Sequence, residues 1–82
     1  MQETFERREK RQFEVLRLLS GAPMRYTVLE KLFVRGTDDS PGIFSDVFYS
    51  LVRSGRIVKC KDEPLAPFRL TEKGKRLLEA LS

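Results

Sequence analysis

The hydrophobic period of this chain changes at Gly55, and this change constrains the fold more than any other sequence feature. Before Gly55, apolar residues recur every three to four positions, which is typical of amphipathic helices. After Gly55, residues 57–61 alternate and carry β-branched side chains, and residues 68–70 offer a short alternating partner. The chain is therefore expected to be a helical body followed by a two-stranded hairpin.

Two helices are expected before residue 40. Thr4 can cap a first helix over about residues 4–20, which the Gly and Pro that follow would end. Thr27 and a Glu three residues later form a capping box for a shorter second helix over about residues 28–35. Gly36 has turn chemistry, so the second helix is expected to end just before it.

Two further helices have equally clear starts. Ser40 can accept hydrogen bonds from early backbone N–H groups, and Pro41 has its φ angle pre-set for a first helical position. They predict a third helix over about residues 41–54, with a Gly past its end. Thr71 can cap a helix as Ser40 does, and it predicts a last helix over about residues 72–81.

Residues 56–70 form the predicted hairpin, or wing. Its tip, residues 62–67, contains two prolines, which cannot donate ladder hydrogen bonds. Cys60 is expected to be a small core residue on the inner face of its strand. Three cations are expected to share the outer face of the wing: Lys59, Lys61 and Arg69.

The chain of 82 residues has room for one small core and not for two. The predicted fold class is α+β, mainly α. Its architecture is a winged helix-turn-helix with three helices, a two-stranded wing hairpin and a C-terminal helix, in a single DNA-binding domain over residues 1–82.

This order of elements carries a resemblance to a known family, the PadR-like winged-helix transcriptional regulators. The residues that carry it are Leu16-Arg17-Leu18-Leu19, Pro23-Met24, Tyr26, Ser40-Pro41-Gly42-Ile43-Phe44, Phe48, Leu51, Gly55, Ile57 and Phe68-Arg69-Leu70-Thr71-Glu72-Lys73-Gly74. The chain is also similar to the related HxlR and MarR groups over the same stretch. PadR proteins usually carry a His-Gly pair where this chain has Arg25, and a long C-terminal dimerisation helix. The resemblance implies a regulator of transcription that binds double-stranded DNA.

The third predicted helix divides into two faces. Phe44, Phe48 and Leu51 lie within about 60° of one another at 100° per residue, and they form the core side. The opposite side is polar, as a helix that reads a major groove must be. Arg53 suits a phosphate or a guanine edge, whereas phosphates repel Asp46 unless it accepts from a cytosine or pairs with an Arg. The candidate DNA-binding residues are Ser40, Gly42, Ser45, Asp46, Tyr49, Ser50, Arg53, Lys59, Lys61 and Arg69.

The apolar arc of the first helix is wider than the roughly 100° that one core needs. The extra positions fit either the flanks of one core or a second copy of the chain. A homodimer would match a two-fold DNA site, because it presents two recognition helices. The candidate interface residues are Phe5, Phe13, Leu18, Leu78 and Leu81.

Composition narrows the function classes. The chain has no His and one Cys, so it lacks the commonest general base and the usual ligands of a zinc site. We therefore expect no enzyme activity, no catalytic residue, no metal and no cofactor. No stretch approaches the roughly 18 consecutive apolar residues of a membrane span, so no membrane partner is expected. A lone Cys fits the reducing cytoplasm, where the protein would be associated with the nucleoid.

Charge supports a nucleic-acid partner, since the net charge is +4. Residues 1–40 hold eight basic and seven acidic side chains, and residues 41–82 hold eight basic and five acidic ones. The leading hypothesis is a sequence-specific DNA-binding regulator. Binding to single-stranded nucleic acid or RNA is the third hypothesis. The alternative is a winged-helix protein-interaction module in a transcription or other cytoplasmic assembly. It is favoured by the acidic residues near the same face: Asp38, Asp39, Asp46, Asp62 and Glu63.

Overall fold

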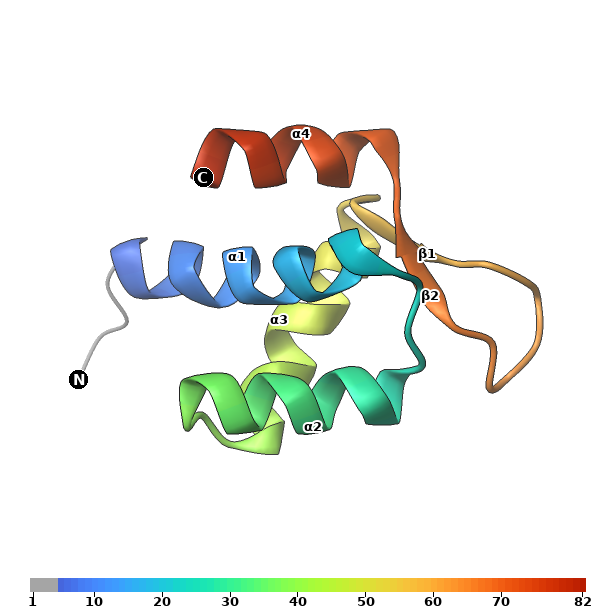
Figure 1. The fold of residues 1–82 in the computed structure, drawn as a ribbon, viewed down its shortest axis with the longest axis horizontal. Coiled ribbons are helices and arrows are strands. Elements are labelled where there is room, and N and C mark those ends of the chain that lie inside the picture. Colours follow the sequence, from blue (N-terminus) through green and yellow to red (C-terminus); the bar gives the residue numbers. More distant parts are fainter. Residues whose placement is uncertain (1–4) are drawn as a thin grey trace.

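The structure, a computed structural model, describes residues 5–82, with side chains from Arg7 onward (Figure 1). Its elements are α1 (Phe5–Gly21), α2 (Tyr26–Thr37), α3 (Pro41–Arg53), β1 (Ile57–Lys59), β2 (Phe68–Leu70) and α4 (Glu72–Leu81). The predicted cap at Thr4 lies outside the described residues. No helix between residues 5 and 82 is long and apolar enough to cross a membrane.

Helix α1 lies at the centre of the molecule. It packs against α2, α3, β2 and α4, and Figure 1 shows α2 and α4 on opposite sides of it. Every element except α4 contributes to the core cluster, whose members are Val15, Leu16, Leu19, Leu29, Phe33, Phe44, Phe48, Leu51, Ile57, Phe68 and Leu70. Helix α4 instead places partly buried leucines against this core. Part of the wide apolar arc on α1 is therefore covered within the chain.

The ends of α2 differ from the sequence prediction. The helix begins at Tyr26, so Thr27 is a helical residue and does not cap it; Arg25 precedes the first turn without a side-chain cap. The Tyr26 ring packs edge-on against Phe48, with the ring centroids 4.9 Å apart, and this tertiary contact fixes the first turn. Gly36 does not end the helix either, because Asp38 adopts the left-handed conformation, with φ at 60°, and donates its N–H to the Val34 carbonyl.

The starts of α3 and α4 confirm the capping predictions. Ser40 Oγ accepts a hydrogen bond from the Ile43 N–H at 3.3 Å, and Pro41 occupies the first helical position. Thr71 Oγ1 accepts from the Gly74 N–H at 3.1 Å in the same way. Ser40 lies in the turn between α2 and α3, and Thr71 lies between β2 and α4. In both cases a side chain directly before the helix sets where the helix begins.

The wing is a short antiparallel ladder in which Ile57, Val58 and Lys59 pair with Leu70, Arg69 and Phe68 respectively. An additional bridge was not expected from the sequence: Met24, in the link between α1 and α2, exchanges backbone hydrogen bonds with Phe68 at 2.7 and 3.0 Å. Strand β2 is thus held on both edges. The bridge anchors the wing to the helical body at the point where the two helices meet.

Gly74 has a packing role in the first turn of α4. A Cβ atom at this position would lie 2.1 Å from the backbone carbonyl oxygen of Arg56, a distance at which the backbone must move. The same carbonyl accepts the Thr71 N–H at 3.0 Å. The close approach of α4 to the residue before β1 therefore requires glycine at position 74.

We expect Gly74→Ala to lower the free energy of unfolding by about 2 kcal/mol, because the added methyl must displace backbone. Chemical denaturation followed by circular dichroism measures this change. Gly21→Ala is the matched control: a methyl group added there, at the end of α1, would have no atom within 4 Å, and we expect a change within about 0.5 kcal/mol. Equal effects of the two substitutions would contradict the assigned role of Gly74.

Candidate nucleic-acid interface

Helix α3 turns one face into the core and the opposite face outward. Phe44, Phe48 and Leu51 are fully buried, as predicted. The predicted recognition face is mostly open to solvent: Gly42, Asp46, Tyr49 and Arg53 are exposed, whereas Ser45 and Ser50 are half-buried. The burial of the aromatic side therefore presents a polar surface about three turns long on the other.

Tyr49 is the aromatic member of this exposed face. Half of its surface is accessible (50%), yet the ring packs edge-on against Phe48 at 5.3 Å and lies 6.1 Å from the Tyr26 ring. Two buried or partly buried rings thus hold one side of Tyr49. A ring held in this way can contact a base or a sugar at little further cost in side-chain entropy.

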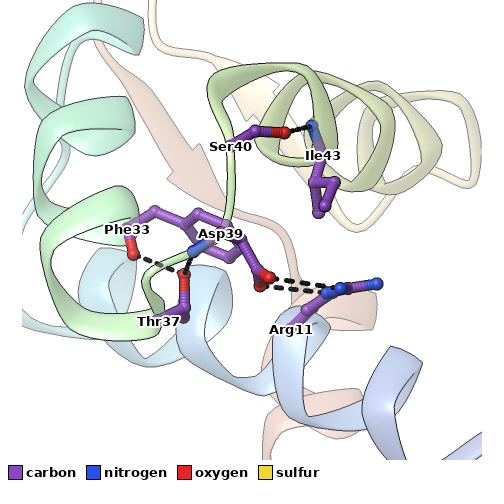
Figure 2. Close-up of polar contacts among 6 residues, drawn as sticks. All are labelled: Arg11, Phe33, Thr37, Asp39, Ser40 and Ile43. Atoms are coloured by element: carbon purple, nitrogen blue, oxygen red, sulfur yellow. Dashed lines mark hydrogen bonds and ion pairs between the residues drawn. The ribbon is translucent and has the colours of Figure 1, made fainter.

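The turn before α3 is tied to α1 (Figure 2). Arg11 donates through Nε and Nη2 to the two carboxylate oxygens of Asp39, at 3.0 and 3.1 Å. The Thr37 hydroxyl donates to the Phe33 carbonyl and accepts the Asp39 N–H. Ser40 is exposed beside this network, where its hydroxyl caps α3.

Helix α1 also borders the exposed face of α3, which was not predicted. A hollow of about 190 Å³ lies between the two helices, lined by Arg8, Gln12, Asp46, Val47 and Ser50. Asp46 thus shares a hollow with a cation, which weakens the objection that its charge repels phosphate. The signal in the sequence was the polar Gln12 on the apolar stripe of α1, with Arg8 one turn before it.

The wing cations do not share one face, and this part of the prediction is wrong. Lys59 pairs with Phe68, and its Nζ lies 6.0 Å from the centroid of that ring, whereas Arg69 pairs with Val58 on the opposite face. The prediction placed the inward-facing positions of β1 one residue away from where they lie. A shift of one residue moves every side chain of a strand to the other face. Ile57 takes the buried position of β1, so Lys59 follows on the same side, beyond the edge of the core.

Cys60 is exposed, so its prediction as a core residue is also wrong. Strand β1 ends at Lys59, and the Cys60 N–H then closes the loop by donating to the Pro67 carbonyl at 2.8 Å. Lys61 is exposed in this loop. The tip presents Leu65, which is 75% exposed, while Ala66 beside it is buried.

The predicted interface residues lie around α1 and the end of α4. Phe13 and Leu81 line a second, larger hollow of about 720 Å³ together with Arg11 and Asp39. Leu18, Leu78 and Leu81 are partly buried against the core of their own chain. Phe13 is half-buried and lies outside that core, and the side chain of Phe5 lies outside the described residues.

Two charged residues on α1 pair with each other within the helix. Arg17 donates two hydrogen bonds to the Glu14 carboxylate one turn earlier. This hydrogen bonding, with the attraction between the opposite charges, raises the pKa of Arg17. The Glu14 carboxylate also lies against Gly36, where a Cβ would approach its Oε1 to 3.2 Å. A side chain at position 36 would therefore meet only the flexible end of Glu14.

Comparisons with known proteins identify the fold. The sequence matches no protein-family model, and a search of curated proteins finds no match. Among solved structures, the crystal structure of SSV1 F-93 is similar to this chain, with a TM-score of 0.71 over 87% of this chain and 79% of that chain, at 21% sequence identity. F-93 is a winged-helix protein. The chain therefore has the predicted fold class, a mainly α winged helix-turn-helix.

Proposed function

We propose that this chain is a sequence-specific regulator of transcription that binds double-stranded DNA with α3 in the major groove and the wing on the backbone. It acts as a binding protein and not as an enzyme, on the nucleoid in the cytoplasm. The PadR-like sequence resemblance and the winged-helix fold support this proposal. Fold alone does not assign a function, so the argument rests on the surface of α3.

The observation that carries the proposal is the exposed face of α3. A helix that reads a major groove must offer hydrogen-bonding side chains from one side while the other side is fixed in a core. Arg53 and Tyr49 are exposed on a helix whose aromatic side is fully buried. Gly42 and Ser40 are exposed at its N-terminal end, where the Gly42 N–H can approach a phosphate.

The charge around α3 is consistent with this role. Arg53 lies at the C-terminal end of α3, and Arg69 lies on the exposed face of β2. Arg8 on α1 adds a cation beside Asp46. With this cation beside it, the Asp46 carboxylate can accept a hydrogen bond from a cytosine amino group, because the cation offsets the repulsion between the carboxylate and nearby phosphates.

The second candidate function is a protein-interaction module, favoured by the wing tip. Leu65 is the most exposed large apolar residue in residues 7–82, and Asp62 and Glu63 are exposed beside it. Negative charge at the tip disfavours a groove of DNA and favours a basic protein surface. A stoichiometric partner that resists nuclease treatment, and that Leu65→Glu releases, would support this function over DNA binding.

Arg53→Ala tests the proposed function directly. We expect it to weaken binding to a duplex selected from a random-sequence pool by about tenfold, because one side chain can supply about 1–3 kcal/mol of base discrimination. Fluorescence anisotropy at several salt concentrations measures the loss. Arg76→Ala is the matched control, since Arg76 is exposed on α4, on the far side of α1 from α2. Unchanged affinity in Arg53→Ala would show that this residue of α3 does not recognise the base sequence, and would contradict the proposed role of α3.

The opposite faces of the wing predict different roles for its cations. We expect Arg69→Ala to reduce the slope of log affinity against log salt by about 0.9, as the loss of one phosphate contact requires. Lys59 covers the Phe68 ring, so Lys59→Ala should lower thermal stability and leave this slope unchanged. A salt titration of both variants, with thermal melts, separates the two. A reversed result would place the other face of the wing on DNA.

We also propose that the chain acts as a homodimer through α1 and the end of α4. Phe13, with Leu81 in the same hollow, offers apolar surface outside the core. We expect Phe13→Glu to convert a dimer into a monomer in sedimentation velocity at micromolar concentration, whereas Leu65→Glu at the remote wing tip should leave the dimer intact. A wild-type chain that sediments as a monomer under these conditions would refute the arrangement.

A further inference from the structure

The connection between α2 and α3 is only three residues long, and side chains constrain most of it. Asp38 takes the left-handed conformation, and its N–H donates to the Val34 carbonyl at 2.9 Å. Thr37 accepts the Asp39 N–H at 3.2 Å, and Ser40 caps α3. These contacts belong to α2 and α3 themselves, so they fix the turn locally but do not relate it to the rest of the molecule.

Arg11 supplies the link to another element. It reaches the turn from 28 residues earlier in the chain and grips both carboxylate oxygens of Asp39 (Figure 2). The side chains are only 12% and 21% exposed, so solvent screens the pair less than an ordinary surface ion pair. A planar guanidinium that donates two parallel hydrogen bonds fixes orientation as well as distance.

The Arg11–Asp39 pair lies directly before the N-terminal end of α3. Asp39 immediately precedes Ser40, and Ser40 and Gly42 are exposed at the N-terminal end of α3, where we placed backbone contacts to DNA. A shift of the turn relative to α1 would therefore displace the start of α3 relative to the bound DNA. Arg11 itself is only partly exposed and points at Asp39 (Figure 2).

We propose that Arg11 is a positioning residue of the DNA-binding surface: it sets the N-terminal end of α3 through Asp39 and does not contact DNA. The inference rests on the proposed function. It adds that binding depends on a residue of α1, an element outside the helix-turn-helix itself. A lysine at position 11 would keep the charge but lose the two-pronged grip.

Asp39→Asn gives the sharpest test, because positioning and simple electrostatics predict opposite signs. Removing a negative charge near DNA strengthens binding if only the field matters. If Asp39 positions α3, the same change weakens binding by about tenfold, since the carboxylate that holds Arg11 is lost. Anisotropy with the selected duplex, at a temperature where circular dichroism shows the variant folded, measures the affinity.

Asp38→Asn is the matched control. It makes the same change of charge at the adjacent residue, Asp38 is exposed, and Asn tolerates a positive φ. We expect its affinity to stay within about twofold of wild type, as for a solvent-screened charge. Arg11→Lys is the second variant and carries the test if Asp39→Asn does not fold; it should also weaken binding, with the salt slope unchanged.

Each outcome decides the inference. Weaker binding by Asp39→Asn or Arg11→Lys, with an unchanged salt slope and with Asp38→Asn near wild type, supports positioning. Binding by Asp39→Asn that equals or exceeds that of Asp38→Asn overturns it. Arg11→Gln removes the charge that lysine keeps, and a reduced salt slope in that variant would place Arg11 on a phosphate and overturn the inference as well. A wild-type chain that binds no duplex overturns the proposed function, whereas the preceding results overturn this inference alone.

Discussion

The contacts between aromatic rings around α3 are the interaction on which the rest of this structure depends. The ring centroids of Phe44 and Phe33 of α2 are 5.2 Å apart. Those of Phe48 and Phe68 of β2 are 4.7 Å apart, and these two rings are nearly perpendicular. These rings join three elements into one core, and the edge-to-face pair of Phe48 and Phe68 fixes orientation more strictly than aliphatic contacts do. Because one side of α3 is held in this way, the polar side has a defined direction relative to the wing.

The sequence predicted best what local chemistry decides. Ser40, Thr71 and the Gly at position 55 set the starts of α3 and α4 and the end of α3, and each acts within a few residues of its own position. The outer face of α3 followed from helical periodicity alone. Most of the candidate DNA-binding residues could therefore be placed on one surface before any tertiary contact was known.

Tertiary contacts explain the predictions that were wrong. Tyr26 begins α2 early because its ring packs against α3. The phase of β1 depends on which of its residues meets the core, and three residues are too few to show this by alternation. Likewise, nothing near Arg11 in the sequence indicates Asp39 as its partner, since the two residues meet only in the folded chain.

The exposure of Cys60 has a practical consequence. The chain contains one cysteine, and it lies where β1 leaves the ladder and the wing tip begins. A fluorophore or spin label attached to this thiol would sit on the wing without any change to the native sequence, and no second thiol would compete for it. Motion of the wing relative to α3 can thus be followed spectroscopically in the unmodified protein background, free and in the presence of a partner.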